Sequence, residues 1–187
     1  MRIVVGISGA SGAIYGVRIL EVLSRLGVET HLVLSGTAAE TIAYETPYTP
    51  EQVLALAHKA YPVNDVGAAI SSGSFRTDGM IVAPCSMKTL AGIANSYNDN
   101  LLTRAADVTL KERRKLVLMV RETPLHLGHL RHMVAVTEMG AVVLPPMPAF
   151  YHRPQTIDEI IDQSVGKALD QFGLDASLFR RWTGPEG

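Results

Sequence analysis

A glycine-rich stretch near the N-terminus carries the clearest chemical signal in the sequence. Residues 4–16, VVGISGASGAIYG, place four glycines and two serines directly after a short apolar run. Such a turn between a strand and a helix leaves backbone N–H groups free, and the helix dipole favours an anion beside them. The pattern predicts a phosphate-binding loop whose Ser8 and Ser11 point at the start of the helix. The alternative is a tight turn without a ligand.

The spacing of these glycines argues against two familiar phosphate ligands. A dinucleotide loop reads G-x-G-x-x-G and is followed by an acidic residue at the end of the second strand. Here the glycines fall as G-x-x-G-x-x-G, and the second predicted strand ends in Ser35. An ATP-binding Walker loop closes with G-K-[ST], but no lysine follows Gly12. A mononucleotide such as FMN is therefore the leading ligand class.

A second candidate anion or flavin contact lies in the segment APCSMKTLAGIANS. Ser86 and Thr89 fall at the start of a predicted helix that follows a strand, with Lys88 between them. Hydroxyl and ammonium groups at such a place suit an anion. The alternative is that Ser86 only caps the helix.

Basic residues gather in the second half of the chain. Arg104 and Lys111 are seven residues apart, so they share one helix face and are expected to reach a common anion. Most of the KERRK segment (111–115) is interpreted as a solvated helix end, where the dipole favours cations. Arg121 and Glu122 follow the fourth predicted strand, which is a position typical of functional residues.

Two weaker signals remain open. His126, His129 and His132 are three residues apart in HLGHLRH, but no HExxH pattern or carboxylate partner accompanies them, so metal binding is disfavoured. Cys85 at a strand end is either a nucleophile or a small buried hydrophobe, and the second interpretation is favoured.

Strands alternate with helices along the chain, which predicts an α/β fold. We expect a three-layer, doubly wound, mostly parallel sheet of the Rossmann-like/flavodoxin-like type, with the ligand at the carboxyl ends of the strands. The sequence predicts one flavoprotein domain over residues 1–187, with a C-terminal tail from about 174 to 187. The predicted strands are 2–7, 29–35, 78–86, 115–120 and 141–145. The predicted helices include 49–60, 87–96, 100–114, 125–139 and 156–172.

Composition narrows the classes of partner. The net charge of −1 does not favour nucleic acid, which needs a basic surface. A single cysteine excludes an internal disulfide and fits a reducing compartment. No stretch is long enough to span a bilayer, and the N-terminus lacks a secretory pattern. We therefore expect a cytoplasmic protein without membrane or nucleic-acid partners.

Several long segments together resemble one family. GISGASGAIYGVR, ISSGSFRTDGMIVAPCSMKTLAGI, LLTRAADVTLKERRKLVLMVRETPLHLGHLR and GAVVLPPMPAFYHRP are similar to the UbiX-type flavin prenyltransferases, which include the B subunits of phenolic-acid decarboxylases. The resemblance covers residues 2–182. It implies a homo-oligomer, in this family a dodecamer, that joins the dimethylallyl group of dimethylallyl monophosphate to N5 and C6 of reduced FMN.

The resemblance also implies the fate of the products. Phosphate is released without a metal, and the prenylated FMN serves a partner UbiD-type decarboxylase, in ubiquinone biosynthesis or in aromatic acid decarboxylation. The basic side chains would supply the charge that a metal ion otherwise brings.

Site residues follow from the motif match. The resemblance implies FMN contacts at Gly9, Ala10, Ser11, Ser35, Ser86, Met87, Lys88, Thr89 and Arg121. It implies contacts with the allylic phosphate at Tyr151, Lys167, Arg104 and Lys111, and catalytic roles for Glu122, Ser11 and Glu45. Glu122 is the preferred acid, protonating the phosphate or accepting a flavin proton, and Ser11 is expected near N5.

Two departures from the family pattern bear on the substrate. Lys167 stands where the family usually has arginine, which keeps the charge but loses bidentate geometry. Some members of the family carry a tryptophan before the SGS segment, but this chain has none there, and neither Val66 nor Ile70 offers a π face to a cation.

Two other functions remain as alternatives. One is a flavin-dependent decarboxylase related to the peptidyl-cysteine decarboxylases, although their catalytic histidine and PASANT-like segment are not evident. The other is a non-catalytic FMN-binding subunit of a decarboxylase.

Overall fold

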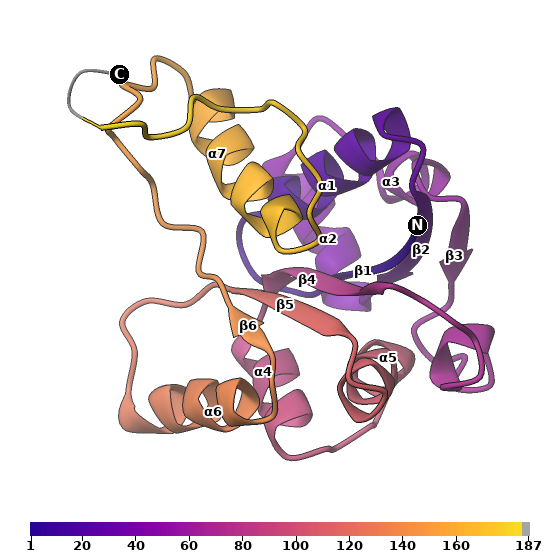
Figure 1. Cartoon of the computed structure of the whole chain (residues 1–187). Helices are drawn as coiled ribbons and strands as arrows, with labels where there is room; N and C mark the ends of the chain where they lie inside the picture. The colour runs from indigo at the N-terminus through magenta and orange to yellow at the C-terminus, as the bar shows by residue number, and fades with distance from the viewer. Residues whose placement is uncertain (185–187) are drawn as a thin grey trace.

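A computed structural model describes residues 1–184, which form one parallel sheet between two layers of helices (Figure 1). The strand order is β3-β2-β1-β4-β5-β6, and every pairing is parallel. This is the order of dinucleotide-binding folds, with the reversal point between β1 and β4. The predicted doubly wound α/β fold is confirmed. The strands are β1 (Arg2–Ile7), β2 (Glu29–Leu34), β3 (Lys59–Tyr61), β4 (Gly79–Cys85), β5 (Lys115–Val120) and β6 (Val142–Val143).

Each face of the sheet has its own apolar core. One face is covered by α1 (Ala13–Arg25), α2 (Gly36–Glu45), α3 (Pro50–Ala55) and α7 (Ile157–Asp170). The other face is covered by α4 (Met87–Ala94), α5 (Leu101–Lys111), α6 (Leu127–Glu138) and the short turn η1 (Ala69–Ser71). The sheet therefore separates α5 from α7, as Figure 1 shows.

Side-chain caps start several helices at the carboxyl edge of the sheet. Ser35 Oγ accepts the N–H of Ala38 at 3.1 Å and begins α2, and Ser86 Oγ accepts that of Thr89 at 3.3 Å and begins α4. Asn100 Oδ1 begins α5 in the same way. These caps satisfy N–H groups that a helix start leaves unpaired. They also place three polar residues beside the ends of β1, β2 and β4.

The predicted helix over 49–60 is wrong in its second half, because α3 ends at Ala55. Residues 59–61 instead form a sixth strand, which pairs with residues 31–33 of β2. The N–H of His58 donates to Thr30 Oγ1, and the N–H of Thr30 donates to His58 Nδ1. These reciprocal hydrogen bonds pull the chain into the sheet, so tertiary pairing overrides the helical pattern.

Helix α2 was not predicted, because its sequence GTAAETIAYE carries no apolar stripe. Only Ala38 and Ile42 of this helix are buried. The Ser35 cap starts this helix, and packing against α1 determines its position.

The C-terminal tail folds back onto α7. The ring of Phe179 packs on Gly166, where a Cβ atom would clash with it, and the Arg181 guanidinium binds both oxygens of Asp170 at 2.7 and 2.9 Å. The predicted tail extends to 187, and its last three residues lie outside the described part of the chain. No helix within residues 1–184 has the length and apolarity needed to cross a bilayer.

Candidate active site

The buried hydroxyl of Ser8 ties the glycine-rich loop to the end of β4. Ser8 Oγ donates to the carbonyl of Pro84 at 2.9 Å and accepts the N–H of Ser86 at 2.8 Å. The expectation that Ser8 points at the start of the helix is therefore wrong, because strand-end contacts use its hydroxyl. Ser11, in contrast, is exposed.

Glu45, the last residue of α2, closes the same loop. Its Oε2 accepts the backbone N–H of Gly12 at 2.7 Å. Gly12 has φ +94°, a left-handed conformation that favours glycine. One N–H of the predicted phosphate loop is thus occupied by a carboxylate of the protein itself. The loop brings Glu45 and Ser11 together at the start of α1.

Gly9 lets the loop approach α2. A Cβ atom at Gly9 would lie 2.5 Å from both Cβ and Cγ2 of Thr37, which is closer than real side chains come. Beside this contact is a cavity of about 240 Å³ at the carboxyl ends of β1, β2 and β4, the place where ligands of such sheets bind. It is lined by Gly9, Ser35, Thr37, Ser86, Lys88, Thr89, Asn100 and Leu102.

This cavity unites most of the predicted flavin contacts. Sequence reasoning missed two of its polar residues, Thr37 and Asn100, although the helix-capping pattern of Asn100 was a usable signal. Met87 does not line the cavity and packs instead against the apolar core under α4. Ser86 serves both interpretations at once, because it caps α4 and also lines the cavity.

Two of the predicted flavin contacts, Lys88 and Ala10, already have partners within the protein. Lys88 Nζ lies 2.6 Å from the Asp99 carboxylate. The N–H of Ala10 donates to the carbonyl of Ser8, so it is already satisfied.

Arg121 and Glu122 directly follow β5 and are exposed. The N–H of Arg121 donates to the carbonyl of Cys85, which fixes this corner beside the end of β4. Burial raises the pKa of the Tyr15 phenol, while the Ser164 hydroxyl and the positive charge of Arg121 oppose that shift. The charge of Arg121 therefore acts on Tyr15, a residue in the first turn of α1. Sequence reasoning did not single out Tyr15.

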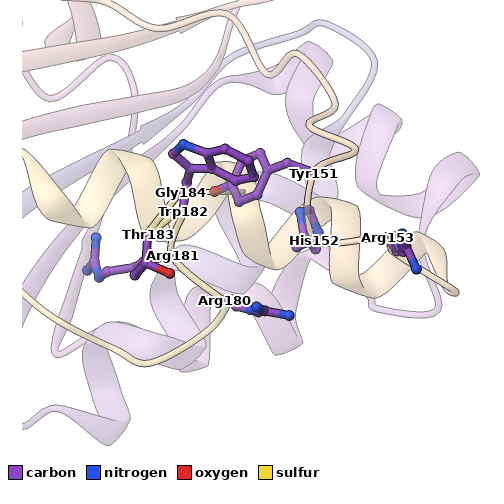
Figure 2. Close-up of a pocket in the computed structure, with 8 residues that line it drawn as sticks. All are labelled: Tyr151, His152, Arg153, Arg180, Arg181, Trp182, Thr183 and Gly184. Carbon is purple, nitrogen blue, oxygen red and sulfur yellow. The ribbon is translucent and has the colours of Figure 1, made fainter. Parts of the chain in front are cut away.

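Tyr151 lies under the C-terminal tail. Figure 2 shows its ring against that of Trp182, with 5.9 Å between the ring centroids. A cavity of about 310 Å³ lies between residues 151–153 and 180–184 and is lined by Arg153, Arg180 and Arg181 (Figure 2). Lys167 of α7 lies on this side of the sheet, with its Nζ 3.9 Å from the Asp170 carboxylate. Trp182 is a further site candidate that sequence reasoning missed.

Arg104 and Lys111 lie on the opposite face of the sheet. Arg104 Nε donates to the carbonyl of Ser71 at 3.1 Å, and Lys111 Nζ is 2.5 Å from Glu112. Helix α5 begins beside the 240 Å³ cavity at the carboxyl edge and ends at Lys111, four residues before β5 starts at the amino edge. One chain therefore does not bring Lys111 to Tyr151 or Lys167.

The two positions that lack the family's tryptophan differ in exposure. The side chain of Val66 is more than half exposed, whereas Ile70 is buried in the core under α5. An aromatic ring at position 66 would therefore reach the surface of this face.

The weaker candidates have structural roles. Cys85 is fully buried, and burial raises the pKa of its thiol to about 12, so it is protonated at neutral pH. His126 Nδ1 accepts the N–H of Gly128 and caps α6. Within residues 1–184, no three His, Cys, Asp or Glu side chains are arranged to hold a metal ion.

Comparison with known proteins identifies close relatives of the whole chain. A family model described as flavoprotein matches residues 1–169. The flavin prenyltransferase UbiX of Thauera aromatica is 69% identical over 186 residues, covering 100% of this chain and 96% of the relative.

Solved structures agree with the sequence relatives. AnUbiX in complex with FMN and dimethylallyl pyrophosphate matches with a TM-score of 0.97 and 57% identity, covering 98% of this chain and 97% of that one. A dodecameric FMN-dependent UbiX-like decarboxylase from Escherichia coli O157:H7 also gives 0.97, at 55% identity, covering 98% and 100% of the two chains. The peptidyl-cysteine decarboxylase EpiD shares the fold alone, with a TM-score of 0.60 and 18% identity over 80% of this chain and 88% of that one.

Proposed function

The chain belongs to the flavoprotein family and, within it, to the UbiX-type flavin prenyltransferases, and from this membership we propose how its residues divide the reaction among them. It is a prenyltransferase that uses FMN, as the resemblance of its motifs predicted. This conclusion rests on the 69% sequence identity to a flavin prenyltransferase over the full length of the chain.

The 240 Å³ cavity fits the phosphate end of FMN. Its hydroxyl groups from Ser35, Thr37 and Thr89 offer hydrogen bonds, and Lys88 offers a positive charge. The N-termini of α2 and α4 both begin at this cavity, and their dipoles favour an anion. When bound, reduced FMN supplies the nucleophilic ring atoms that accept the prenyl group.

The glycine-rich loop and its neighbours handle protons near the flavin ring. We assign Ser11 and Glu45 to this end of the site because the hydrogen bond from the Gly12 N–H holds the Glu45 carboxylate, at the end of α2, against the loop that contains Ser11. Glu122 is assigned as the acid that protonates the departing phosphate or accepts a ring proton, and Arg121 as a cation that contacts FMN. Both follow the end of β5, where functional residues of parallel sheets gather.

The departing phosphate needs positive charge around it, because charge develops on its oxygens as the allylic bond breaks. Tyr151 and Lys167 lie on the α7 side of the sheet, whereas Arg104 and Lys111 lie on the α5 side. These four residues act on one phosphate only if a second copy of the chain contributes Arg104 and Lys111. A homo-oligomer supplies that copy, and a solved relative is dodecameric.

The product also implies a partner. We propose that prenylated FMN passes to a UbiD-type decarboxylase and that both proteins work in the reducing cytoplasm, which suits a chain with one buried free thiol.

Residues 1–184 act as one domain, because the C-terminal tail packs on α7.

The test is anaerobic incubation with reduced FMN and dimethylallyl monophosphate, followed by mass spectrometry of the flavin. We expect a flavin heavier by one prenyl group. An unchanged flavin mass, with FMN bound and the protein folded, would contradict the function.

Glu122→Gln separates an enzyme from a passive flavin carrier. The enzyme is expected to lose prenylation, whereas a carrier would still support a partner decarboxylase. Glu138→Gln is the matched control, because Glu138 is exposed at the end of α6 and lies outside the proposed site.

A further inference from the structure

Arg114 clamps the loop over residues 71–77 and is an exception in the KERRK segment, most of which the sequence predicts to be a solvated helix end. Its Nη2 donates to the carbonyl of Gly73 at 2.7 Å, and its Nη1 donates to that of Phe75 at 3.0 Å and lies 3.4 Å from Thr77 Oγ1. The Arg114 side chain is only 16% exposed, whereas neighbouring Arg113 is exposed. Arg114 is therefore a structural cation and not a solvated one.

The end of α5 directs Arg114 toward this loop. Arg113 has φ +57°, the N–H of Arg113 donates to the carbonyl of Leu110, and the N–H of Arg114 donates to that of Thr109. This is a Schellman ending, in which a left-handed residue reverses the chain. The reversal leaves Arg113 in solvent and turns Arg114 inward.

The clamped loop also touches both cations of α5. Arg104 Nε donates to the carbonyl of Ser71 at 3.1 Å. At Gly73, an added Cβ atom would lie 2.8 Å from Lys111 Nζ and would overlap the Glu112 carboxylate. Arg104 also pairs with Asp107 at 2.9 Å, and Lys111 pairs with Glu112, so the loop backbone is one of two neighbours that position each cation.

We propose that Arg114 is a positioning residue for prenyl transfer: by clamping residues 71–77, it holds Arg104 and Lys111 in the arrangement that binds the substrate phosphate. The proposal rests on the proposed function, because it assigns Arg104 and Lys111 to that phosphate. A planar guanidinium reaches two carbonyls at once, which a lysine ammonium does not reproduce.

The test compares Arg114→Ala and Arg114→Lys with Arg113→Ala, a control that removes the same charge one residue away. For Arg114→Ala we expect the KM for dimethylallyl monophosphate to rise about tenfold to a hundredfold, because small displacements of a binding group are costly. We expect kcat to change less and the Kd for FMN to stay unchanged. Arg114→Lys should give an intermediate KM, and Arg113→Ala should behave as wild type.

Gly73→Ala perturbs the same contact from the loop side. Its Cβ would push against Lys111 and Glu112, so the same rise in KM is expected without any loss of charge. This variant and Arg114→Lys keep the proposal testable if Arg114→Ala does not fold.

Three results would overturn the proposal. One is a KM within about twofold of wild type in Arg114→Lys and Gly73→Ala, with only the melting temperature lowered. The second is an equal KM rise in Arg113→Ala, which would indicate general charge. The third is an affinity for inorganic phosphate, measured by calorimetry, that stays at the wild-type value in variants whose KM rises. If wild type does not prenylate FMN, the proposed function fails, and the phosphate-binding comparison alone decides the role of Arg114.

Discussion

The Glu45 carboxylate accepts the backbone N–H of Gly12 at 2.7 Å and so joins the end of α2 to the residue that precedes α1. A carboxylate at a helix N-terminus is favoured by the helix dipole, so this bond stabilises the loop before any ligand arrives. It also places an acidic side chain next to Ser11, in the part of the site assigned to the flavin ring.

Glu45 variants separate the structural role of this bond from a role in proton transfer. Glu45→Gln keeps an oxygen acceptor for the Gly12 N–H but removes the charge and the exchangeable carboxyl proton. We expect its FMN affinity to stay close to wild type and its prenylation rate to fall by roughly 10²–10⁴-fold. Glu45→Ala should also weaken FMN binding, by about tenfold, because it removes the charged hydrogen bond that holds the glycine-rich loop to the end of α2.

Stopped-flow turnover and FMN titration measure these effects, with Glu40→Gln as control, since Glu40 is an exposed residue of the same helix. Full turnover by Glu45→Gln would show that Glu45 only closes the loop.

Gly9→Ala tests the close approach of the loop to α2. The new methyl group would meet Thr37 at 2.5 Å, so we expect a loss of about 1–3 kcal/mol in the free energy of unfolding, together with weaker FMN binding. Thr37→Gly removes both of the clashing atoms. The double variant should therefore be less destabilised than the sum of the single variants. Strictly additive unfolding free energies, measured with urea, would place the strain elsewhere.

Strand-end reasoning found Ser35, Ser86, Lys88 and Thr89 because a parallel sheet collects the residues that follow its strands at one edge. It did not find the hydrogen bond between Glu45 and Gly12. Glu45 ends α2, and that helix was not predicted because its sequence has no apolar stripe. Residue type and spacing also do not reveal which face of the sheet a helix covers. The family resemblance implies that Lys111 and Tyr151 contact one phosphate, but it does not reveal that one chain holds them on opposite faces of the sheet.

Cys85 gives a prediction about pH. Its folded-state pKa of about 12 exceeds the reference value of 9.0, so burial of the neutral thiol stabilises the fold fully below pH 9. That contribution is lost as the pH rises from 9 toward 12, by about 1.4 kcal/mol per pH unit. Cys85→Ala should lack this decline, while keeping its prenylation activity.

Urea unfolding between pH 7 and 11 measures the difference between wild type and Cys85→Ala. Parallel stability curves for the two proteins, or alkylation of the native thiol at the rate of a free cysteine, would contradict this assignment.

In the proposed oligomer, each active site takes Tyr151 from one copy of the chain and Lys111 from another. Lys111→Ala and Tyr151→Phe are each expected to lose most of their prenylation activity. Mixed oligomers, co-expressed with two tags and checked by native mass spectrometry, should regain up to roughly a quarter of wild-type activity, because random pairing restores that share of sites. Mixed oligomers no more active than their parents would show that the phosphate site is not shared between copies.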